Sequence, residues 1–401
     1  MKVVITIGGL SPEFGGPSRS IPALAEALAR ENVDVDLLTC EAQPEHGAPA
    51  LPDAKLVRTT LLPVRSRRGW RASRNDFVRS TRDLIEKSSD TVIHDNGLWL
   101  PTNHAVAAVA RFLSRPLLVS PRGMLSAWAL RHHAWKKRIA WTFFQRRDFL
   151  GASVIHVTSG QELDDARRAG YRGPIAVVPN GVDLMVEDGR RKMEDRSGQP
   201  STISDLQTSR RPRMALFVGR LHRVKGLMNL IEAWNEVRPK GWRMVIAGGD
   251  EDGHRAELES TIAKRGLVAE FQFTGPVEGE QKRTLFDEAD LFVMPSHSEN
   301  FGMSIAEALG NGVPVITTRG TPWRDLIDHR CGWWEEIGVE PLARALREAT
   351  EMPDTTRREM GRCGRDLVAA KYSWSGVAKQ MKSVYQWLLG QGEQPACISP
   401  N

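Results

Sequence analysis

Five short apolar runs recur between residues 214 and 318: MALFVG (214–219), RMVIAGG (243–249), FQFTG (271–275), LFVMPS (291–296) and VPVITT (313–318). Each run has the length of a buried strand, and a helix-length segment separates it from the next. Strands that alternate with helices are typical of a parallel sheet with helices on both faces. We therefore predict a doubly wound, Rossmann-like α/β domain over residues 214–373.

The preceding part of the chain alternates in the same way and predicts a similar domain over residues 1–186. Its expected elements are strands at 3–7, 33–38, 92–94, 117–120 and 154–158 and a helix at 17–30. Residues 187–213 are polar without an apolar period, which indicates a linker or surface insertion. Residues 374–401 contain an amphipathic helix and a polar tail. Two such domains are expected to face each other across a deep cleft at the carboxyl ends of both sheets.

The composition is that of an ordinary globular protein. The chain has 401 residues, of which 41% are hydrophobic and 26% charged, which excludes a mostly disordered chain. The N-terminus resembles a first buried strand and not a signal peptide, and the uncharged stretch 96–110 is too short to span a bilayer. The four cysteines lie far apart without Cys-x-x-Cys spacing. We therefore expect a soluble, cytosolic protein in a reducing compartment.

The excess positive charge lies in the first half of the chain. Of the net charge of +6, residues 1–185 carry +7 and the remainder carries −1. A local excess of this sign indicates a negatively charged partner for the first domain. Phosphorylated ligands, nucleic acid and an anionic membrane surface are the candidates.

Two segments at strand ends have residues suited to phosphate. The glycine-rich turn at 8–17 follows the first strand and opens a helix, where free N–H groups favour an anion. Its spacing does not match the dinucleotide fingerprint, and a tight turn that needs glycine is the simpler interpretation. In VGRLHRVKG (218–226), Arg220 and Lys225 follow a strand and can form a diphosphate clamp. The alternative is a pair of solvated surface cations.

A third segment, MPSHSENFGMSIAEA (294–308), places two glutamates on either side of a glycine-containing loop that leads into a helix. Glu299 in the loop can hydrogen-bond a sugar, while Glu307 in the helix can bind a ribose. The backbone N–H groups of the residues between them are free to contact a phosphate at the helix start. These residues are Phe301, Gly302, Met303 and Ser304.

These motifs resemble those of the retaining GT-B glycosyltransferases of family 4. VPNGVD (178–183) is similar to the family's segment at the domain junction, VGRLHRVKG to its phosphate clamp, FTGPV (273–277) to its base-contacting turn, and ENFGMSIAEALGNGVPVI (299–316) to its donor-sugar loop. Order and spacing agree from Gly8 to about Ser375, so the resemblance covers nearly the whole chain.

The resemblance implies a role for each matching position. Arg220 and Lys225, next to Gly219, would hold the donor diphosphate and stabilise the leaving group. Glu299 would contact the transferred sugar, the N–H groups from Asn300 to Ser304 would bind sugar and phosphate, and Glu307 would bind the ribose. The turn from Gly275 to Val277 would frame the base, and Gly15 and Gly16 would close on the phosphates.

The same resemblance assigns functions to the two domains: 1–186 would bind the acceptor, 214–373 would bind the nucleotide sugar, and the C-terminal helix would pack back on the first domain. It implies a nucleoside-diphosphate sugar as co-substrate, without a metal or other cofactor. Asp34-Val35-Asp36 spells a metal-binding pattern, but it lies inside an alternating strand, and we interpret it as structural.

One position departs from the family pattern. Where many members have a histidine near the donor sugar, SPRGML (120–125) has Arg122. Arg122 would be a permanent cation that can bind a leaving phosphate or an anionic acceptor group but cannot accept a proton. The alternative is a structural arginine paired with a carboxylate such as Asp95. His94 and Asn96 end the preceding strand and are candidates to line the same site on the acceptor side.

The stretch 126–150 combines aromatic and basic residues in a helix-like pattern. Trp128, Trp135, Ile139 and Phe143 form an apolar stripe, and cations surround it, among them Lys136, Lys137 and Arg138. Together with a second basic run at 65–82, this stretch can lie on an anionic membrane. Packing of the stripe on the domain core is the alternative.

The sequence therefore predicts a retaining glycosyltransferase of the hexosyltransferase type. The acceptor predicted from charge and aromatics is a lipid-linked saccharide in bacterial surface polysaccharide assembly, reached by peripheral docking on the inner face of the cell membrane. A soluble-acceptor transferase, a nucleotide-sugar epimerase and a sugar phosphorylase are alternatives on the same fold. A basic nucleic-acid-binding protein is an alternative of another class, but no known nucleic-acid-binding motif accompanies the charge, and we predict no nucleic-acid partner.

Overall fold

The computed structural model describes residues 1–11, 15–41, 49–63, 74–86, 88–183 and 212–399. The chain divides into two compact units: unit 1 contains Met1–Gly181 and Lys371–Asn401, and unit 2 contains Val182–Ala370. Most of the predicted linker, 187–213, and part of the second basic run lie outside the described residues. Each unit is built on one mainly parallel sheet.

The sheet of unit 1 has the strand order β14-β7-β6-β5-β4-β1-β2-β3. All neighbours pair in parallel except β14, which is antiparallel to β7. The strands are β1 (Lys2–Ile7), β2 (Asp34–Cys40), β3 (Arg58–Leu62), β4 (Thr91–Asn96), β5 (Leu117–Ser120), β6 (Val154–Val157), β7 (Ile175–Val177) and β14 (Ile398–Ser399). β1, β4, β5 and β6 are buried along their whole lengths, and β1, β5 and β6 consist mainly of apolar residues, as buried parallel strands do.

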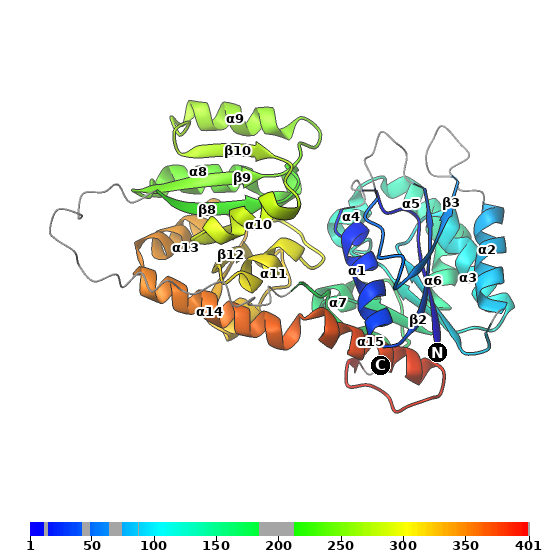
Figure 1. Cartoon of the computed structure of the whole chain (residues 1–401). Helices are drawn as coiled ribbons and strands as arrows, with labels where there is room; N and C mark the ends of the chain where they lie inside the picture. Colours follow the sequence, from blue (N-terminus) through cyan, green and yellow to red (C-terminus); the bar gives the residue numbers. More distant parts are fainter. Residues whose placement is uncertain (12–14, 42–48, 64–73, 87, 184–211, 400–401) are drawn as a thin grey trace. The chain divides into compact units, whose positions relative to one another are not determined.

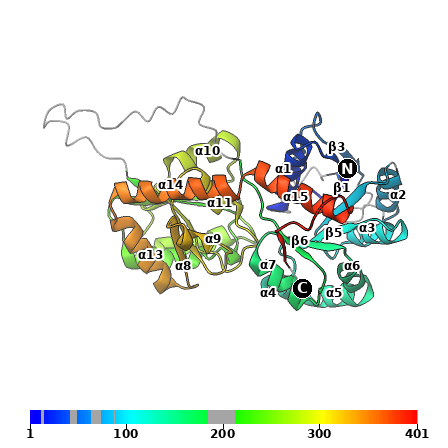
Figure 2. The same ribbon diagram turned by 90° about the horizontal axis from the view of Figure 1, so that it is seen from below.

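Helices cover both faces of this sheet and enclose two apolar cores (Figure 1). The C-terminal helix packs against α1, and Val377, Met381 and Val384 share a core with Ile21 and Leu24. The two helices lie side by side in Figures 1 and 2. The helices of unit 1 are α1 (Pro17–Arg30), α2 (Arg74–Glu86), α3 (Pro101–Phe112), α4 (Ala127–Arg131), α5 (Ala134–Ala140), the π-helix η3 (Trp141–Gln145), α6 (Arg146–Leu150), α7 (Gly160–Arg168) and α15 (Trp374–Leu388).

Unit 2 has a six-stranded parallel sheet of order β10-β9-β8-β11-β12-β13. Its strands are β8 (Arg213–Val218), β9 (Trp242–Ala247), β10 (Phe271–Gly275), β11 (Leu291–Met294), β12 (Val315–Thr318) and β13 (Gly332–Glu335). Its helices are the 3₁₀ turn η5 (Arg223–Lys225), α8 (Leu227–Val237), α9 (His254–Lys264), α10 (Gly279–Glu288), α11 (Met303–Gly310), α12 (Asp325–Asp328), α13 (Val339–Glu351) and α14 (Asp354–Lys371). These elements confirm the predicted fold class of two doubly wound domains.

Both sheets reverse their strand order beside the first strand of the unit. In unit 1 the reversal falls at β1, with β2 on one side and β4 on the other. In unit 2 it falls at β8, between β9 and β11. Ligands of doubly wound folds bind at the carboxyl ends of the strands that flank such a reversal. The residues that follow β8 and β11 in unit 2, and those that follow β1 and β4 in unit 1, are therefore the ones to inspect.

Local features differ from the prediction in both units, and the short strands β7, β13 and β14 were not predicted. β3 was not predicted, because its sequence RTTLL has little apolar character and the strand lies at the edge of the sheet, half exposed. The stretch 126–150 is not one helix, because the chain interrupts it at His132 and His133. His133 has a left-handed backbone, with φ of 50°, which an α-helix cannot accommodate.

Candidate active site

Two cations follow β8 in unit 2, as predicted, and each contacts a carboxylate from another strand-to-helix loop. Arg220 donates from Nη1 to both carboxylate oxygens of Glu251, at 2.7 and 2.6 Å. Lys225, at the end of η5, forms an ion pair with Glu299 from the loop after β11. The helix that follows, α8, is preceded by its cap residue Gly226, whose φ is +69° and whose Cβ position would lie 2.1 Å from the carbonyl oxygen of Pro295. Glycine here allows the Lys225 turn to approach the end of β11.

The Lys225–Glu299 pair is mostly buried. The side chains are 13% and 12% exposed, and Ser296 Oγ donates a second hydrogen bond to Glu299 Oε1 at 2.8 Å. The backbone N–H of Glu299 donates to the carbonyl of Gly320 at 2.8 Å. Glu299 is therefore held from three sides, and the predicted clamp cation and the predicted sugar-binding carboxylate are direct neighbours. The interpretation of Lys225 as a solvated surface cation is wrong.

The loop from Asn300 to Ser304 leads into α11 as expected. Its cap residue, Gly302, has φ of +83°, and no side chain caps the helix start. Trp323 Nε1 donates to the carbonyl of Phe301 at 2.5 Å, and the two rings pack with centroids 5.4 Å apart. The loop is thus fixed by a buried tryptophan, and the uncapped first turn leaves backbone donors that suit an anion. The predicted phosphate contacts of Met303 and Ser304 remain predictions.

Glu307 lies one turn further along α11 and contacts a residue that sequence reasoning missed. Lys282 of α10 places its Nζ 2.6 Å from Glu307 Oε1. Glu307 Oε2 is buried and has no hydrogen-bond partner among the described residues. An unsatisfied buried carboxylate oxygen is costly, which is typical of a group kept for a ligand. Glu251 and Lys282 are site residues that no motif indicated, and Ser296 lies within the quoted segment 294–308 but was given no role there.

The predicted base-contacting turn follows the end of β10. The carbonyl of Gly275 accepts a hydrogen bond from the N–H of Gly248, at the end of β9, at 2.8 Å. Gly219, after β8, donates to the carbonyl of Ala247 at 2.9 Å. These bonds hold the three strand ends in register, with Val277 just beyond them. Base binding by Gly275 and Val277 remains a prediction.

Arg122 of unit 1 is buried, with 8% of its surface exposed. Its Nε and Nη2 donate to Asn96 Oδ1 at 3.0 and 2.8 Å, and its Nη1 donates to Asn180 Oδ1 at 3.1 Å. The alternative pairing with Asp95 is wrong, because Asp95 accepts instead from Thr6 and Asn103. Burial raises the pKa of Asp95 to about 6.

His94 lies in the interior of unit 1. Its ring nitrogens contact the Tyr385 hydroxyl and Ser120 Oγ, both at 2.7 Å, and Ser120 Oγ also contacts His156. Burial lowers the pKa of His94 well below its ordinary value, and the electrostatic effects of His156 and Arg122 lower it further. These contacts connect α15 to β4, β5 and β6, and they favour a structural role for His94 over the predicted contact with the acceptor.

The glycine-rich turn is described only in part, because residues 12–14 lie outside the described residues. Gly15 has φ of +67°, and its carbonyl accepts from Ser18 Oγ at 2.7 Å. Gly16 precedes Pro17 at the start of α1 without a side-chain cap. A helix start of this kind fits an anion, and the predicted phosphate contact of Gly15 and Gly16 remains a prediction.

Asp34 and Asp36 lie in β2 and form ion pairs with basic side chains. Asp36 contacts Lys2 at 2.7 Å and Arg58 at 2.8 Å, and Asp34 contacts Arg58 at 2.5 Å. Burial alone would raise the pKa of Asp36, but the Arg58 and Lys2 contacts outweigh it and lower that pKa. The pattern is structural. In the described residues no group of three or more His, Cys, Asp or Glu side chains is placed to hold a metal ion.

The predicted amphipathic stretch forms an exposed apolar and basic surface of unit 1. Trp128, Trp135, Ile139 and Phe143 are 44%, 63%, 50% and 81% exposed, so core packing of this stripe is wrong. The exposed cations beside them include Lys136 and Arg138. We refer to these six residues, with Lys137, as the α4–α6 surface.

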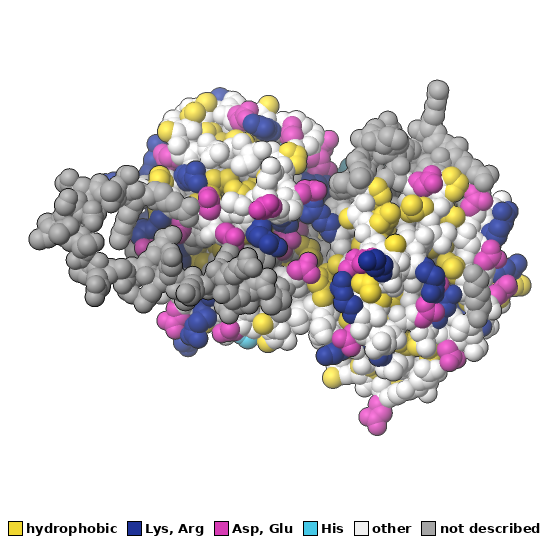
Figure 3. Space-filling model, in the orientation of Figure 1, with side chains coloured by type: hydrophobic (Ala, Val, Ile, Leu, Met, Phe, Trp, Pro, Cys, Tyr) yellow, Lys and Arg dark blue, Asp and Glu magenta, His cyan; other side chains and the backbone are white. Residues whose placement is uncertain are grey.

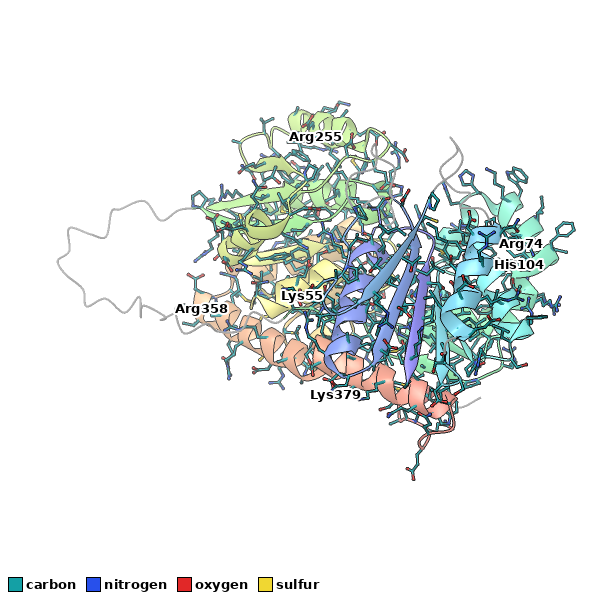
Figure 4. The ribbon with its side chains drawn as sticks, turned by 45° about the vertical axis from the view of Figure 1, so that its right-hand side comes forward. Lys55, Arg74, His104, Arg255, Arg358 and Lys379 are labelled. Carbon is teal, nitrogen blue, oxygen red and sulfur yellow. The ribbon has the colours of Figure 1, made fainter. Side chains whose placement is uncertain are left out.

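The helices under this surface are fixed to the domain. Asp148 of α6 contacts His104 of α3 at 2.6 Å and Arg111 at 2.7 Å, and the rings of His104 and Phe144 pack 5.1 Å apart. Figure 4 shows His104 and Arg74 on this side of unit 1, where neighbouring side chains project outward. The face that carries α1, in contrast, has acidic and basic side chains interspersed (Figure 3). In the described parts of the chain, no helix is long and apolar enough to cross a membrane.

Known proteins resemble both units. Residues 15–181 match the family described as "Glycosyl transferase 4-like domain", and residues 200–367 match "Glycosyl transferases group 1". The GDP-mannose:cellobiosyl-diphosphopolyprenol alpha-mannosyltransferase of Xanthomonas oryzae pv. oryzae is 27% identical over 328 residues, which cover 79% of this chain and 78% of that protein. The D-inositol 3-phosphate glycosyltransferase of Arthrobacter sp. is 30% identical over 388 residues, which cover 92% of this chain and 89% of that protein.

Among solved structures, sucrose-phosphate synthase from Thermosynechococcus elongatus superposes with a TM-score of 0.76 at 22% identity, covering 98% of this chain and 100% of that one. The two parallel-sheet units and these matches define a nucleotide-sugar-dependent glycosyltransferase with the GT-B fold. The chain belongs to the group 1, or family 4, glycosyltransferases.

Proposed function

We propose that the protein transfers a sugar from a nucleoside-diphosphate sugar to an acceptor hydroxyl with retention of the anomeric configuration. The observation that carries this proposal is the buried Lys225–Glu299 pair at the strand-order reversal of unit 2. The cation proposed for the leaving diphosphate lies next to the carboxylate proposed for the sugar. Transfer breaks the bond between the sugar and the diphosphate, so it requires both groups close together.

In the proposed reaction the bond between the anomeric carbon and the phosphate oxygen breaks while the acceptor oxygen approaches on the same face. The acceptor proton passes to the departing phosphate oxygen. Lys225 and Arg220 stabilise the negative charge that develops on the diphosphate, and fixed charges of this kind commonly lower a barrier by several kcal/mol. Glu299 orients the sugar by accepting hydrogen bonds from its hydroxyls. No side chain of the chain is needed as a nucleophile.

Release of nucleoside diphosphate from a panel of GDP-, UDP-, ADP- and dTDP-sugars identifies the donor. NMR of the product then gives the anomeric configuration. We expect one donor to be preferred and the product to keep the donor's configuration. An inverted product would refute the retaining route, and a single epimerised nucleotide sugar formed without acceptor would favour the epimerase alternative.

We propose a lipid-linked saccharide as the acceptor, as in the assembly of a bacterial surface polysaccharide. The relatives support an acceptor with a phosphate: one acts on cellobiosyl-diphosphopolyprenol and the other on D-inositol 3-phosphate, by their names. The charge of +7 over residues 1–185 supports an anionic partner for unit 1. A small soluble acceptor is the rival, and would leave the exposed aromatic residues without a function.

We propose further that the α4–α6 surface docks on an anionic membrane. Exposed Trp135 and Phe143 provide interfacial contacts, and the neighbouring cations match the charge of the headgroups. Replacing Lys136, Lys137 and Arg138 by Ala removes two exposed charges, at about 1 kcal/mol each, and the half-buried Lys137, whose Nζ donates to the carbonyl of Ala129. We therefore expect vesicle affinity to fall by roughly thirtyfold or more.

Vesicle sedimentation tests this docking with phosphatidylglycerol-containing and purely zwitterionic vesicles. The control replaces three exposed cations outside the surface, Lys264, Arg358 and Lys379, by Ala; Arg358 and Lys379 are labelled in Figure 4. The control removes the same charge, and we expect it to bind nearly as well as wild type. Equal losses for both triple variants would show a non-specific charge effect, and salt-independent absence of wild-type binding would refute docking.

A further inference from the structure

Arg122 is a buried cation without a carboxylate partner among the described residues. Its hydrogen-bond partners in the described part of the chain are the amide oxygens of Asn96 and Asn180. The acid that most influences it, Glu162, is committed elsewhere: its Oε1 accepts from the N–H of Gly123 at 2.7 Å and its Oε2 from Thr158. Burying an ion away from water costs several kcal/mol unless a counter-ion compensates it. A guanidinium that is 92% buried, that hydrogen-bonds only to neutral amides among the described residues, and with which Glu162 makes no direct ion pair is therefore incomplete as a structural feature.

The position of Arg122 in the fold is that of a ligand-binding residue. Arg122 follows β5, and its partner Asn96 is the last residue of β4, which borders the strand-order reversal at β1. Asn96 therefore borders the crevice in which doubly wound folds bind ligands, and Arg122 reaches it from the neighbouring strand end. The backbone of Arg122 is left-handed, with φ of +54°, followed by Gly123 at +77°. A long side chain in this conformation is uncommon and is found preferentially at functional sites.

The charged group that acts most strongly on the guanidinium is the Glu162 carboxylate, and the two nearby imidazoles carry no charge. Arg122 is among the causes that lower the pKa values of His94 and His156, so both imidazoles are neutral beside it. The guanidinium carries five N–H donors, and three of them go to the two asparagines. One N–H remains on each terminal nitrogen, a pair that matches two oxygens of a phosphoryl group.

We propose that Arg122, held by Asn96 and Asn180, is a phosphoryl-binding site of unit 1, separate from the cation pair of unit 2. The site takes the phosphate of the acceptor, and in this respect the inference rests on the proposed anionic acceptor. The same chemistry is available from the donor's diphosphate, so the experiment must distinguish the two sources.

The test uses Asn180→Asp, which places a carboxylate where the Asn180 amide oxygen lies, 3.1 Å from Arg122 Nη1. The exchange is nearly isosteric and supplies an internal counter-ion. Asn235→Asp is the matched control, since Asn235 Oδ1 accepts from Arg238 at 2.8 Å in an exposed pair of the same kind in unit 2. If Arg122 binds a phosphoryl group, Asn180→Asp raises the melting temperature and weakens anion binding, whereas Asn235→Asp leaves anion binding unchanged.

Anion binding is measured by calorimetry with inorganic pyrophosphate. The full chain used for this measurement carries Arg220→Met and Lys225→Met, so that the two cations of unit 2 are removed. We expect pyrophosphate to bind this background and Asn180→Asp to weaken the binding at least tenfold. Absence of pyrophosphate binding in the background, or unchanged binding in Asn180→Asp despite a raised melting temperature, overturns the proposal and leaves Arg122 structural. A folded Arg122→Lys variant, which keeps the charge but loses the fork, should bind with intermediate affinity.

GDP and UDP binding to the chain that keeps Arg220 and Lys225 shows whether the phosphoryl group belongs to the acceptor or to the donor. GDP and UDP affinities that Asn180→Asp leaves unchanged assign the site to the acceptor. A loss of nucleotide affinity in Asn180→Asp would overturn the acceptor assignment and place the donor diphosphate there. Failure of the proposed function can be distinguished from failure of the Arg122 site. In that case the wild-type chain would release no nucleoside diphosphate from any nucleotide sugar.

Discussion

Removing Lys225 should damage both stability and turnover, and the two effects can be separated. Lys225→Met leaves Glu299 12% exposed with Ser296 as its remaining side-chain donor. Loss of one partner from a buried pair costs up to about 3–5 kcal/mol. Because both side chains keep some contact with water, we expect a smaller loss of unfolding free energy, about 2 kcal/mol. Turnover should fall by roughly two orders of magnitude or more, because the cation at the developing negative charge is gone.

The double variant Lys225→Met/Glu299→Gln distinguishes the two losses. Neutralising both partners removes the unpaired charge, so we expect most of the stability to return while turnover stays low. Urea unfolding gives the stability, and nucleoside diphosphate release gives the turnover. Arg223→Ala serves as the control, since Arg223 lies two residues away in an exposed pair with Glu257, and we expect stability and turnover near wild type.

The single variant Glu299→Gln completes the cycle. Its contacts are assigned to the sugar, so turnover should fall far more than nucleoside diphosphate affinity. Equal losses of both would reassign Glu299 to the nucleotide. Turnover of Lys225→Met within a few-fold of wild type would refute the clamp assignment as a whole.

Three further predictions concern other charged side chains, two in unit 2 and one in unit 1. Lys282→Met releases Glu307 from its ammonium partner, and we expect a raised KM for the donor with a smaller change in kcat; Lys282→Arg should restore much of the KM, and an unchanged KM would make the contact purely structural. Glu251→Gln frees Arg220, and calorimetry should show nucleoside diphosphate binding a few-fold tighter; weaker binding would mean that Glu251 positions the cation. Burial raises the pKa of Asp95 from 3.8 to about 6, so the folded state binds a proton more tightly than the unfolded state, and Asp95 contributes less stability as pH rises from about 4 to about 6. The stability of Asp95→Asn relative to wild type should therefore increase over that window, and a pH-independent difference would contradict the raised pKa.

The sequence alone determined the elements that depend on local order. Buried parallel strands need continuous apolar runs, so β1, β8, β9 and β11 were evident from their residues. The candidate site residues after β8 and β11 could also be predicted from the sequence, because residues that directly follow a buried strand lie at the carboxyl end of that strand. Arg220, Lys225, Glu299 and Glu307 were found in this way, and the family resemblance gave their expected roles.

Only the tertiary structure decided which of these residues touch. Lys225 and Glu299 are 74 residues apart in the chain, and Lys282 and Glu307 come from different helices. Their contacts arise because the sheet order places β11 beside β8, and sheet order is a property of non-local pairing that no local periodicity contains. For the same reason the sequence did not show that Arg122 would meet amides and no carboxylate. The exposure of the α4–α6 stripe was likewise undecided, since a stripe of apolar side chains looks the same whether a core or water lies next to it.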